Sequence, residues 1–440
     1  APGNPGQYDW KAALARKRIH GLLRVRPFDG VVVLGHGQGN PILAAVFRLR
    51  ERWVRLLQEH FEPRDAGLLL ALLLGERTEI DEELREAFVE TGTIHLLVIS
   101  GFNVALIAGL LELGLRLLGL PWRARLGLSA LGLGGYGLLA ELQPPVVRAT
   151  LMAWVVLGSL ALDRAVSWPN TLAAAALAIF WADPTQLFDP GFQLSFGAVL
   201  SLMILAPRWG DWLERWVAWV HPGWLRRYLA LSVAATGSVW AGLAPVLAWY
   251  FHLMSPVSVL ANLLIAPLMS ALIVLGTVLL AAGTLAEPVM AWGGGPIAWL
   301  LHVTVEAVRW CHGVPFGSWV VGRPSPVVMA GYYGLASVTL LRMRLGWSRA
   351  VVLGGWVIAL AAWAGAGVGL RVMESRWLRV DVLDVGHGDS ILLRGAPGHA
   401  ILIDAGSEDA GQFQVVPHLR SLGIASLGAL VLTHPDADHI

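Results

Sequence analysis

The sequence predicts a polytopic α-helical membrane protein of about ten transmembrane helices, followed by the N-terminal part of an α/β domain. Hydrophobic residues make up 56% of the chain and charged residues only 14%, whereas soluble domains carry about 25% charged residues. The apolar residues gather in long runs between residues 94 and 370, as membrane-spanning helices require. From residue 371 onward, short apolar runs alternate with Gly-rich turns, which is the pattern of a soluble sheet domain.

The overall charge and the cysteine content are uninformative about ligands. The formal net charge is +1, so charge alone indicates no nucleic-acid partner. The single cysteine, Cys311, lies in an apolar run and excludes a disulfide framework within the chain. The start is polar, with no signal-peptide pattern, and the first residue is Ala1. We therefore expect a piece of a longer protein.

Two amphipathic segments precede the apolar block. Residues 1–40 are punctuated by Gly and Pro, and "DGVVVLGHG" predicts one or two strands. Residues 41–61 place Arg and Glu between apolar pairs at helical spacing, which predicts a helix on a membrane or protein surface. The run "GLLLALLLG" is too short to span a bilayer, and "ERTEIDEELREAFVETG" predicts a second amphipathic helix. Residues 41–93 are thus expected to form amphipathic helices that precede the membrane-spanning block.

The apolar block from 94 to 370 predicts the spanning helices. Their expected ranges are 94–118, 126–141, 145–162, 168–182, 190–206, 228–250, 256–284, 288–311, 325–341 and 350–370. The 256–284 range contains Asn262 and Pro267, so it could be a broken helix or a re-entrant pair. After the 190–206 helix, the sequence predicts a loop rich in Trp, typical of an interface belt.

The placement of Arg predicts the orientation of the block. One alternating set of short loops holds Arg116, Arg123, Arg125, Arg164, Arg208, Arg215, Arg226, Arg227, Arg342, Arg344 and Arg349. The other set holds little beyond Arg309 and Arg323. Loops rich in Lys and Arg stay in the cytoplasm, so both ends of the block are expected outside.

The last residues predict a metal site at the end of a buried strand. In "LVLTHPDADHI" the side chains of His434, Asp436, Asp438 and His439 follow the strand at once. Imidazole nitrogen and carboxylate oxygen are common metal ligands, and a pair of metal ions can cleave a phosphodiester. An acidic surface turn is the alternative. The strands before it, in "WLRVDVLDVGHGDSILLRG" and "HAILIDAG", and the helix in "VVPHLRSLGI" predict the order strand, strand, strand, helix, strand.

Several polar residues fall within the apolar helices, where polar groups are expensive and usually face a cavity or a partner. They are His95, Ser100, Asn103, Arg148, Asn170, Asp189, Gln193, Ser195 and Asn262. We expect them to line or gate a polar path, and Arg148 is the best candidate to meet a phosphate. Hydrogen bonds between helices are the alternative, and helix capping is the alternative for Asp189.

Long segments of the chain resemble a known family. "TGTIHLLVISGFNVALIAGLL", "PPVVRATLMAW", "DPTQLFDPGFQLSFGAVLSLMILAP" and "SPVSVLANLLIAPL" are similar to the competence domain of the ComEC/Rec2 DNA-internalisation family. "HPDADH" and "LDVGHGDS" resemble the metallo-β-lactamase-like domain that follows it there. "NPGQYDWKAALARKRI" resembles the end of that family's N-terminal OB-like domain, so residues 1–40 would be its remnant.

The resemblance implies a function. The membrane domain, residues 94–370, would be a channel for single-stranded DNA in a bacterial inner membrane, and the domain from 371 to 440 would lie outside the cytoplasm. That outer domain would hold a metallo-hydrolase site with Zn, Mn or Mg. The site would degrade the DNA strand that is not taken up. Asp404 and Asp438 would be catalytic, with Asp404 supporting the metal. Expected partners are membrane lipids and other competence proteins, such as a DNA receptor and a cytoplasmic helicase.

Three positions depart from the family pattern. Asp436 stands where the lactamase motif has a His, which shifts the metal preference from Zn toward Mn or Mg. His387 replaces a Gln, and Asn103 replaces a frequent His. Other interpretations also remain open: a small-solute or lipid-handling transporter joined to a hydrolase, an enzyme with a membrane anchor, or a degenerate nuclease domain.

Overall fold

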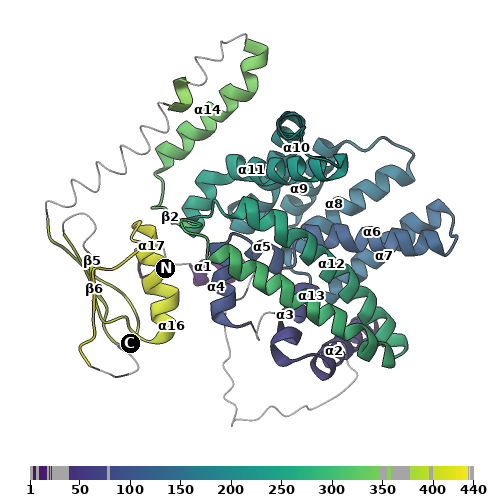
Figure 1. The fold of residues 1–440 in the computed structure, drawn as a ribbon, viewed down its shortest axis with the longest axis horizontal. Helices are drawn as coiled ribbons and strands as arrows, with labels where there is room; N and C mark the ends of the chain where they lie inside the picture. The colour runs from purple at the N-terminus through teal and green to yellow at the C-terminus, as the bar shows by residue number, and fades with distance from the viewer. Residues whose placement is uncertain are drawn as a thin grey trace. The chain divides into compact units, whose positions relative to one another are not determined.

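The computed structural model describes residues 3–5, 9–16, 19, 21, 39–76, 80–345, 354–357, 377–395, 400–434 and 436. The predicted strand near residues 29–37 and most of the predicted 350–370 helix lie outside this set, as do Arg349, Asp438 and His439. The chain forms two compact units, shown in Figure 1. A helical unit contains residues 25–242 and 255–318, and a mixed unit contains residues 1–24, 243–254 and 319–440.

The helical unit is built around α3 (Pro63–Leu74). Every residue from Ala66 to Leu74 is buried, because this helix is apolar on all sides and other helices surround it. Around it lie α2 (Pro41–His60), α4 (Glu82–Glu90), α5 (Ile94–Leu97), α6 (Gly101–Leu117), α12 (Ser258–Leu285) and α13 (Pro288–His312). The short run that cannot cross a bilayer is therefore the centre of a protein core.

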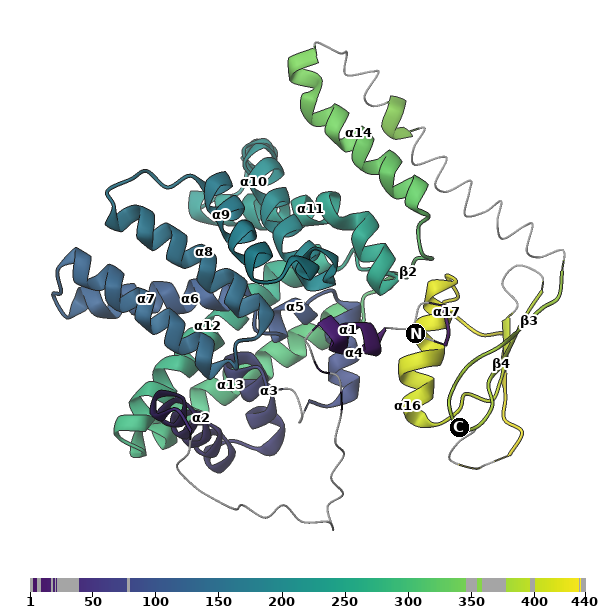
Figure 2. The ribbon, with the colours of Figure 1, turned by 180° about the vertical axis from the view of Figure 1, so that it is seen from behind.

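The remaining helices of this unit follow one another along the chain. They are α7 (Trp122–Leu139), α8 (Pro144–Ala161), α9 (Trp168–Ala182), the 3₁₀ turn η1 (Pro184–Phe188), α10 (Pro190–Trp216) and α11 (Gly223–Phe251), whose end belongs to the mixed unit. Figure 2 shows α6, α7 and α8 packed side by side, and α12 and α13 form an antiparallel hairpin.

Among the described residues, four helices are long and apolar enough to cross a membrane: α8, α10, α11 and α12. The chain is therefore a membrane protein by composition and length of its helices. Two shorter apolar helices lie at 168–182 and 326–341. The expected count of ten spans is not reached on these criteria: α6 is only 17 residues long, and α13, although 25 residues long, is not apolar enough.

Two expected helices differ clearly from the structure. The range 94–118 is divided, because the Ser100 side chain accepts the amide of Phe102 and caps a new helix at Gly101. His95 thus lies on α5, not on the helix of Asn103. The 190–206 helix continues through Pro207 to Trp216, so part of the predicted Trp-rich loop is helical.

The 256–284 range is neither a broken helix nor a re-entrant pair: α12 is one helix of 28 residues that contains Pro267. Proline leaves the carbonyl four residues earlier without its helical donor. Here that carbonyl belongs to Leu263, and the hydroxyl of Tyr228 on α11 donates to it at 2.6 Å. A neighbouring helix therefore satisfies the backbone group that would otherwise favour a break.

The mixed unit contains a small sheet domain with the predicted element order. Strands β3 (Arg379–Val382), β4 (Ile391–Arg394), β5 (Ala400–Ile403) and β6 (Ala429–Val431) lie in that order, with antiparallel, antiparallel and parallel pairs. Between β5 and β6, the helical stretch from α16 (Glu408–Ala410) through η2 (Gly411–Val415) to α17 (Val416–Ser421) lies beside the sheet (Figure 2).

The two faces of this sheet differ. Leu392 and Leu402 are buried with Val415 and Leu419 of the helical stretch, and together they form the domain core. The other face is apolar but open, with Val382 73% exposed. The mixed unit also contains α1 (Trp10–Arg16), α14 (Pro326–Leu345) and the antiparallel pair β1 (Leu253–Met254) and β2 (Trp319–Val320).

Candidate functional site

The N-termini of three helices in the helical unit converge. The Cβ that Gly101 lacks would lie 3.4 Å from the Cβ of Ala149, which joins the start of α6 to the first turns of α8. A Cβ on Gly191 would lie 3.3 Å from Nη2 of Arg148, which joins α8 to the start of α10. Helix N-termini carry partial positive charge, so their convergence favours an anion. Ser100, Asn103, Arg148 and Asp189 lie at these helix starts, and we call them the polar cluster.

Asn103 and Ser100 form the α6 part of the polar cluster. Asn103 is fully buried, and its Nδ2 donates to the carbonyl of Leu72 at 3.0 Å. The Ser100 hydroxyl donates to Oδ1 of Asn103 at 3.3 Å. Both side chains are therefore engaged in capping and in a bond between helices, which is the alternative that the sequence left open.

Gln143, which the sequence analysis did not single out, completes the junction with α3. Its Nε2 donates to the carbonyl of Gly75 at 3.2 Å, and Gly75 ends α3 with φ of 78°. Only glycine adopts this backbone conformation readily, so Gly75 turns the chain away where the other helices begin. The "QPP" sequence before a helix was the available signal, since polar residues there meet backbone ends.

Arg148 is the unusual member of the polar cluster. Its residue is only 4% exposed, and neither Nε nor Nη1 has a hydrogen-bond partner among the described residues. The nearest carboxylate is Asp189, whose Oδ1 lies 3.9 Å from Nη1, beyond hydrogen-bond range. That same oxygen accepts the amide of Phe192 at 2.9 Å and caps α10. Donors of this kind can bind an anion such as a carboxylate or a phosphate.

The other polar residues of the predicted path are placed elsewhere or engaged locally. Nδ1 of His95 donates to the carbonyl of Gly92, and Asn170 is exposed near the start of α9. Gln193 donates to the carbonyl of Leu187, Ser195 is half-buried on α10, and Asn262 lies 3.4 Å from the Thr236 hydroxyl. No contact described here joins His95, Asn170 or Asn262 to the cluster around Arg148.

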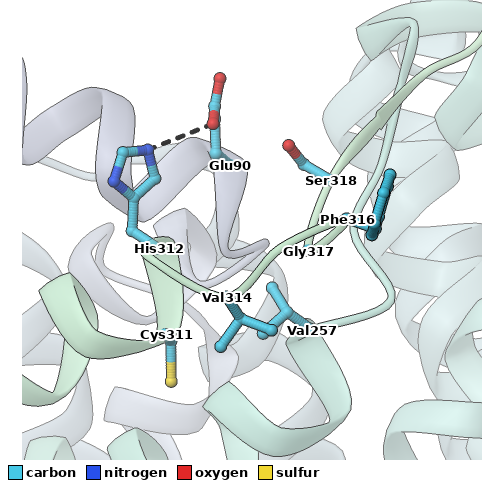
Figure 3. Close-up of a pocket in the computed structure, with 8 residues that line it drawn as sticks. All are labelled: Glu90, Val257, Cys311, His312, Val314, Phe316, Gly317 and Ser318. Carbon is cyan, nitrogen blue, oxygen red and sulfur yellow. Dashed lines mark hydrogen bonds and ion pairs between the residues drawn. The ribbon is translucent and has the colours of Figure 1, made fainter.

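A pocket of about 110 Å³ opens in the same unit at the ends of α4 and α13 (Figure 3). His312 and Glu90 meet above it, with His312 Nε2 and Glu90 Oε2 3.2 Å apart, and Cys311 and Val257 contribute to its walls. Small-molecule sites usually exceed about 300 Å³. This pocket has room for only a few water molecules and is too small for a nucleotide.

In the sheet domain, the residues after β6 hold two of the predicted metal ligands together. Nε2 of His434 lies 3.5 Å from Oδ2 of Asp436. The buried carboxylate of Asp404 accepts the amide and the hydroxyl of Thr433 at 2.8 and 2.6 Å. The oxygen of that hydroxyl lies 2.8 Å from Nδ1 of His434. Asp404 thus orients the loop through Thr433.

This arrangement fits a cation in part. Because the Thr433 hydroxyl donates to Asp404, its oxygen is left to accept a hydrogen bond from Nδ1–H of His434. In that tautomer Nε2 carries no proton, and its lone pair faces Asp436. Two acceptors that face each other need a proton or a metal ion between them. Within the described ranges, no group of three or more His, Cys, Asp or Glu side chains forms a metal cluster. Asp438 and His439 lie outside those ranges.

Comparisons with known proteins agree with this two-part organisation. A family profile described as "Competence protein" matches residues 72–346, and one described as "Metallo-beta-lactamase superfamily" matches residues 383–440. No solved structure gives a significant match.

Three curated relatives match over almost the whole chain. The ComE operon protein 3 of Bacillus subtilis is 26% identical over 99% of this chain and 56% of its own length. The Competence protein ComA of Neisseria gonorrhoeae is 30% identical over 93% and 56%, respectively. The Recombination protein 2 of Haemophilus influenzae is 24% identical over 98% and 59%. This chain therefore spans a little more than half of the length of these relatives.

Proposed function

The chain belongs to the competence protein family, and from this premise we propose that it forms a membrane channel for single-stranded DNA during natural transformation. The family match covers residues 72–346 and thus all nine polar residues of the predicted path. The name of one relative, the Competence protein ComA, supports the same role. The location follows as a bacterial inner membrane that the chain crosses several times.

The observation that carries this proposal is the buried, incompletely paired guanidinium of Arg148 among three helix N-termini. A DNA strand offers one phosphate per nucleotide, and a planar guanidinium binds phosphate oxygens through two parallel hydrogen bonds. Asp189, at 3.9 Å, offsets the charge of Arg148 without occupying its donors. A phosphate that reaches the cluster would take up those donors.

A small-solute or lipid-handling transporter is the alternative. An anionic solute or lipid headgroup would use the same guanidinium, so the polar cluster alone does not distinguish these substrates. The family match favours DNA. Ten or even four spanning helices also exceed what a membrane anchor for a soluble enzyme needs.

The test replaces Arg148 in the full-length gene. We expect Arg148→Ala to lower the transformation frequency at least a hundredfold, because the only buried cation of the cluster is lost, while the protein stays in the membrane. Arg148→Lys keeps the charge but not the planar pair of donors, so it should retain part of the activity.

Arg309→Ala is the matched control. Arg309 is exposed and pairs with Glu306 on its own helix, so its loss should leave the frequency within about twofold of the wild type. A wild-type frequency for Arg148→Ala, with protein in the membrane, would refute the role of the cluster. Normal DNA uptake with lost export of a small anion would favour the transporter.

For the sheet domain we propose a metal-dependent hydrolase outside the cytoplasm, in which His434, Asp436, Asp438 and His439 supply ligands. The metallo-β-lactamase match and the facing atoms of His434 and Asp436 support this. Bound Zn, Mn or Mg would activate water there. The amide of Arg323 donates to the carbonyl of Ser421 in this domain. The uneven placement of Arg between the two sets of loops predicts that the loop with Arg323 lies outside, which supports an outer location for the domain. For DNA uptake as a whole, the proposed partners are a DNA receptor, a cytoplasmic helicase and membrane lipids.

A further inference from the structure

Residues from the two ends of the chain are bonded to each other within the mixed unit. Asn4 is only 5% exposed, although it lies near the start of the chain. Its Nδ2 donates to the carbonyl of Asp384 at 2.7 Å, and its Oδ1 accepts the amide of Asp384 at 2.8 Å. One side-chain amide thus satisfies both backbone groups of a residue 380 positions away.

The place of Asp384 explains why a partner is needed there. Strand β3 is at the edge of the sheet, and the amide of Leu383 just beyond it donates inward to the Ser390 carbonyl. Backbone groups alternate in direction along a strand, so those of Asp384 point to the open edge. Unpaired strand edges are usually covered or blocked. An Asn amide carries one donor and one acceptor side, as a peptide group does, and here it occupies the edge.

Two further contacts make the fit specific. Nδ1 of the buried His418 on α17 donates to the carbonyl of Pro5 at 2.9 Å. A Cβ on Gly3 would lie 2.0 Å from Oδ2 of Asp384, so a larger residue would collide with that side chain. Residues 3–5 therefore contact both the sheet edge and the helix that covers the sheet.

The contacted turn leads to the candidate metal site. The turn from Asp384 to Asp389 ends where the Asp389 carbonyl accepts the amide of Gly406 at 3.1 Å. A Cβ on Gly406 would come within 2.8 Å of the Cβ of Val385, so the turn packs tightly on the segment that follows Asp404. A shift of the turn would consequently be transmitted to Asp404 and its loop.

We propose that residues 3–5 are a clasp that belongs to the C-terminal domain and holds its 384–389 turn in place. The clasp and the domain then lie on the same side of the membrane, and the chain between Pro5 and Asp384 crosses the bilayer an even number of times. This holds whether or not the protein transports DNA. The surface that the clasp occupies is a strand edge, and the occupant is this chain's own N-terminal segment.

Hydrogen exchange on the full chain in lipid nanodiscs tests the clasp. Asn4→Ala removes the acceptor of the Asp384 amide, so exchange in the 383–389 peptide should accelerate at least tenfold, while the 400–403 strand keeps its protection. Lys11→Ala, at an exposed position of α1, should change neither peptide. Unchanged exchange at 383–389 in Asn4→Ala would overturn the clasp.

A labelling experiment keeps the proposal testable if Asn4→Ala fails to fold. In a Cys311→Ser chain, Lys11→Cys and Glu408→Cys each place one thiol at an exposed position. A membrane-impermeant maleimide should label both variants from the same side of intact cells. Labelling from opposite sides would contradict the shared location and therefore the clasp.

Discussion

At the scale of single residues, Thr433 joins Asp404 to His434, although Asp404 and Thr433 are 29 positions apart. Its hydroxyl donates to the carboxylate and its oxygen faces Nδ1 of the imidazole. Such partners of a ligand fix the tautomer and the direction of the ring. The predicted ligands are recognisable in the sequence from their residue types, whereas the hydroxyl of Thr433 has no recognisable signature there.

We expect Thr433→Val in the complete protein to weaken metal binding about 10- to 100-fold, because His434 loses the group that orients it. Thr433→Ser keeps the hydroxyl and should stay within about threefold of the wild type. Titration of the purified protein with Zn²⁺ and Mn²⁺ gives the affinities. Equal affinities for Thr433→Val and the wild type would show that His434 is oriented by other groups or is not a ligand.

Arg148 shows the limit of sequence reasoning at the same scale. An arginine within an apolar run is a visible anomaly, so the sequence analysis selected it. That its Nε and Nη1 are buried without hydrogen-bond partners in the described part of the chain could not be predicted, because this depends on where α10 begins relative to α8. Gly191, which admits the guanidinium to the start of α10, was missed for the same reason.

At the scale of helices and strands, the positions of elements followed from hydrophobic periodicity, whereas their continuity did not. The range 168–182 is a helix with the expected bounds. For the 256–284 range the sequence left a broken helix or a re-entrant pair open, but the helix is continuous, since Tyr228 from another helix supplies the missing donor. A proline predicts a local defect, but whether a neighbour repairs it is decided by packing.

A double-mutant cycle tests this repair. We expect Tyr228→Phe to destabilise the full chain by roughly 0.6 to 1.7 kcal/mol, the range of hydrogen bonds between membrane helices. In a Pro267→Ala background the helix supplies its own donor to Leu263, so the same change should cost clearly less. Unfolding in mixed micelles with increasing dodecyl sulfate measures the difference. An equal loss in both backgrounds would mean that Tyr228 acts through another contact.

At the scale of the whole molecule, the orientation of the helices rests on the asymmetric placement of Arg. The loops after α6 and α8 belong to the Arg-rich set, and the loop between α7 and α8 belongs to the other set. The positive-inside rule predicts that the first set lies in the cytoplasm. Because these loops hold the exposed residues Leu118, Leu142 and Leu162, each can carry a reporter thiol.

In a Cys311→Ser chain, we expect Leu142→Cys to react with an impermeant maleimide in intact cells. Leu118→Cys and Leu162→Cys should react only after the membrane is permeabilised, because a single helix separates Leu142 from each of them. Reaction of Leu118→Cys and Leu142→Cys from one side would mean that α7 does not cross the bilayer.

The sequence by itself determined the class of the molecule, most helix positions and the strand order, because hydrophobicity, periodicity and turn residues act over a few neighbouring positions. The tertiary structure decided which helix N-termini surround Arg148, why α12 passes through Pro267, and that Asn4 closes the edge at Asp384. These features join residues that are far apart in the chain. A short polar side chain gives no local sign of the distant backbone group to which it will be bonded.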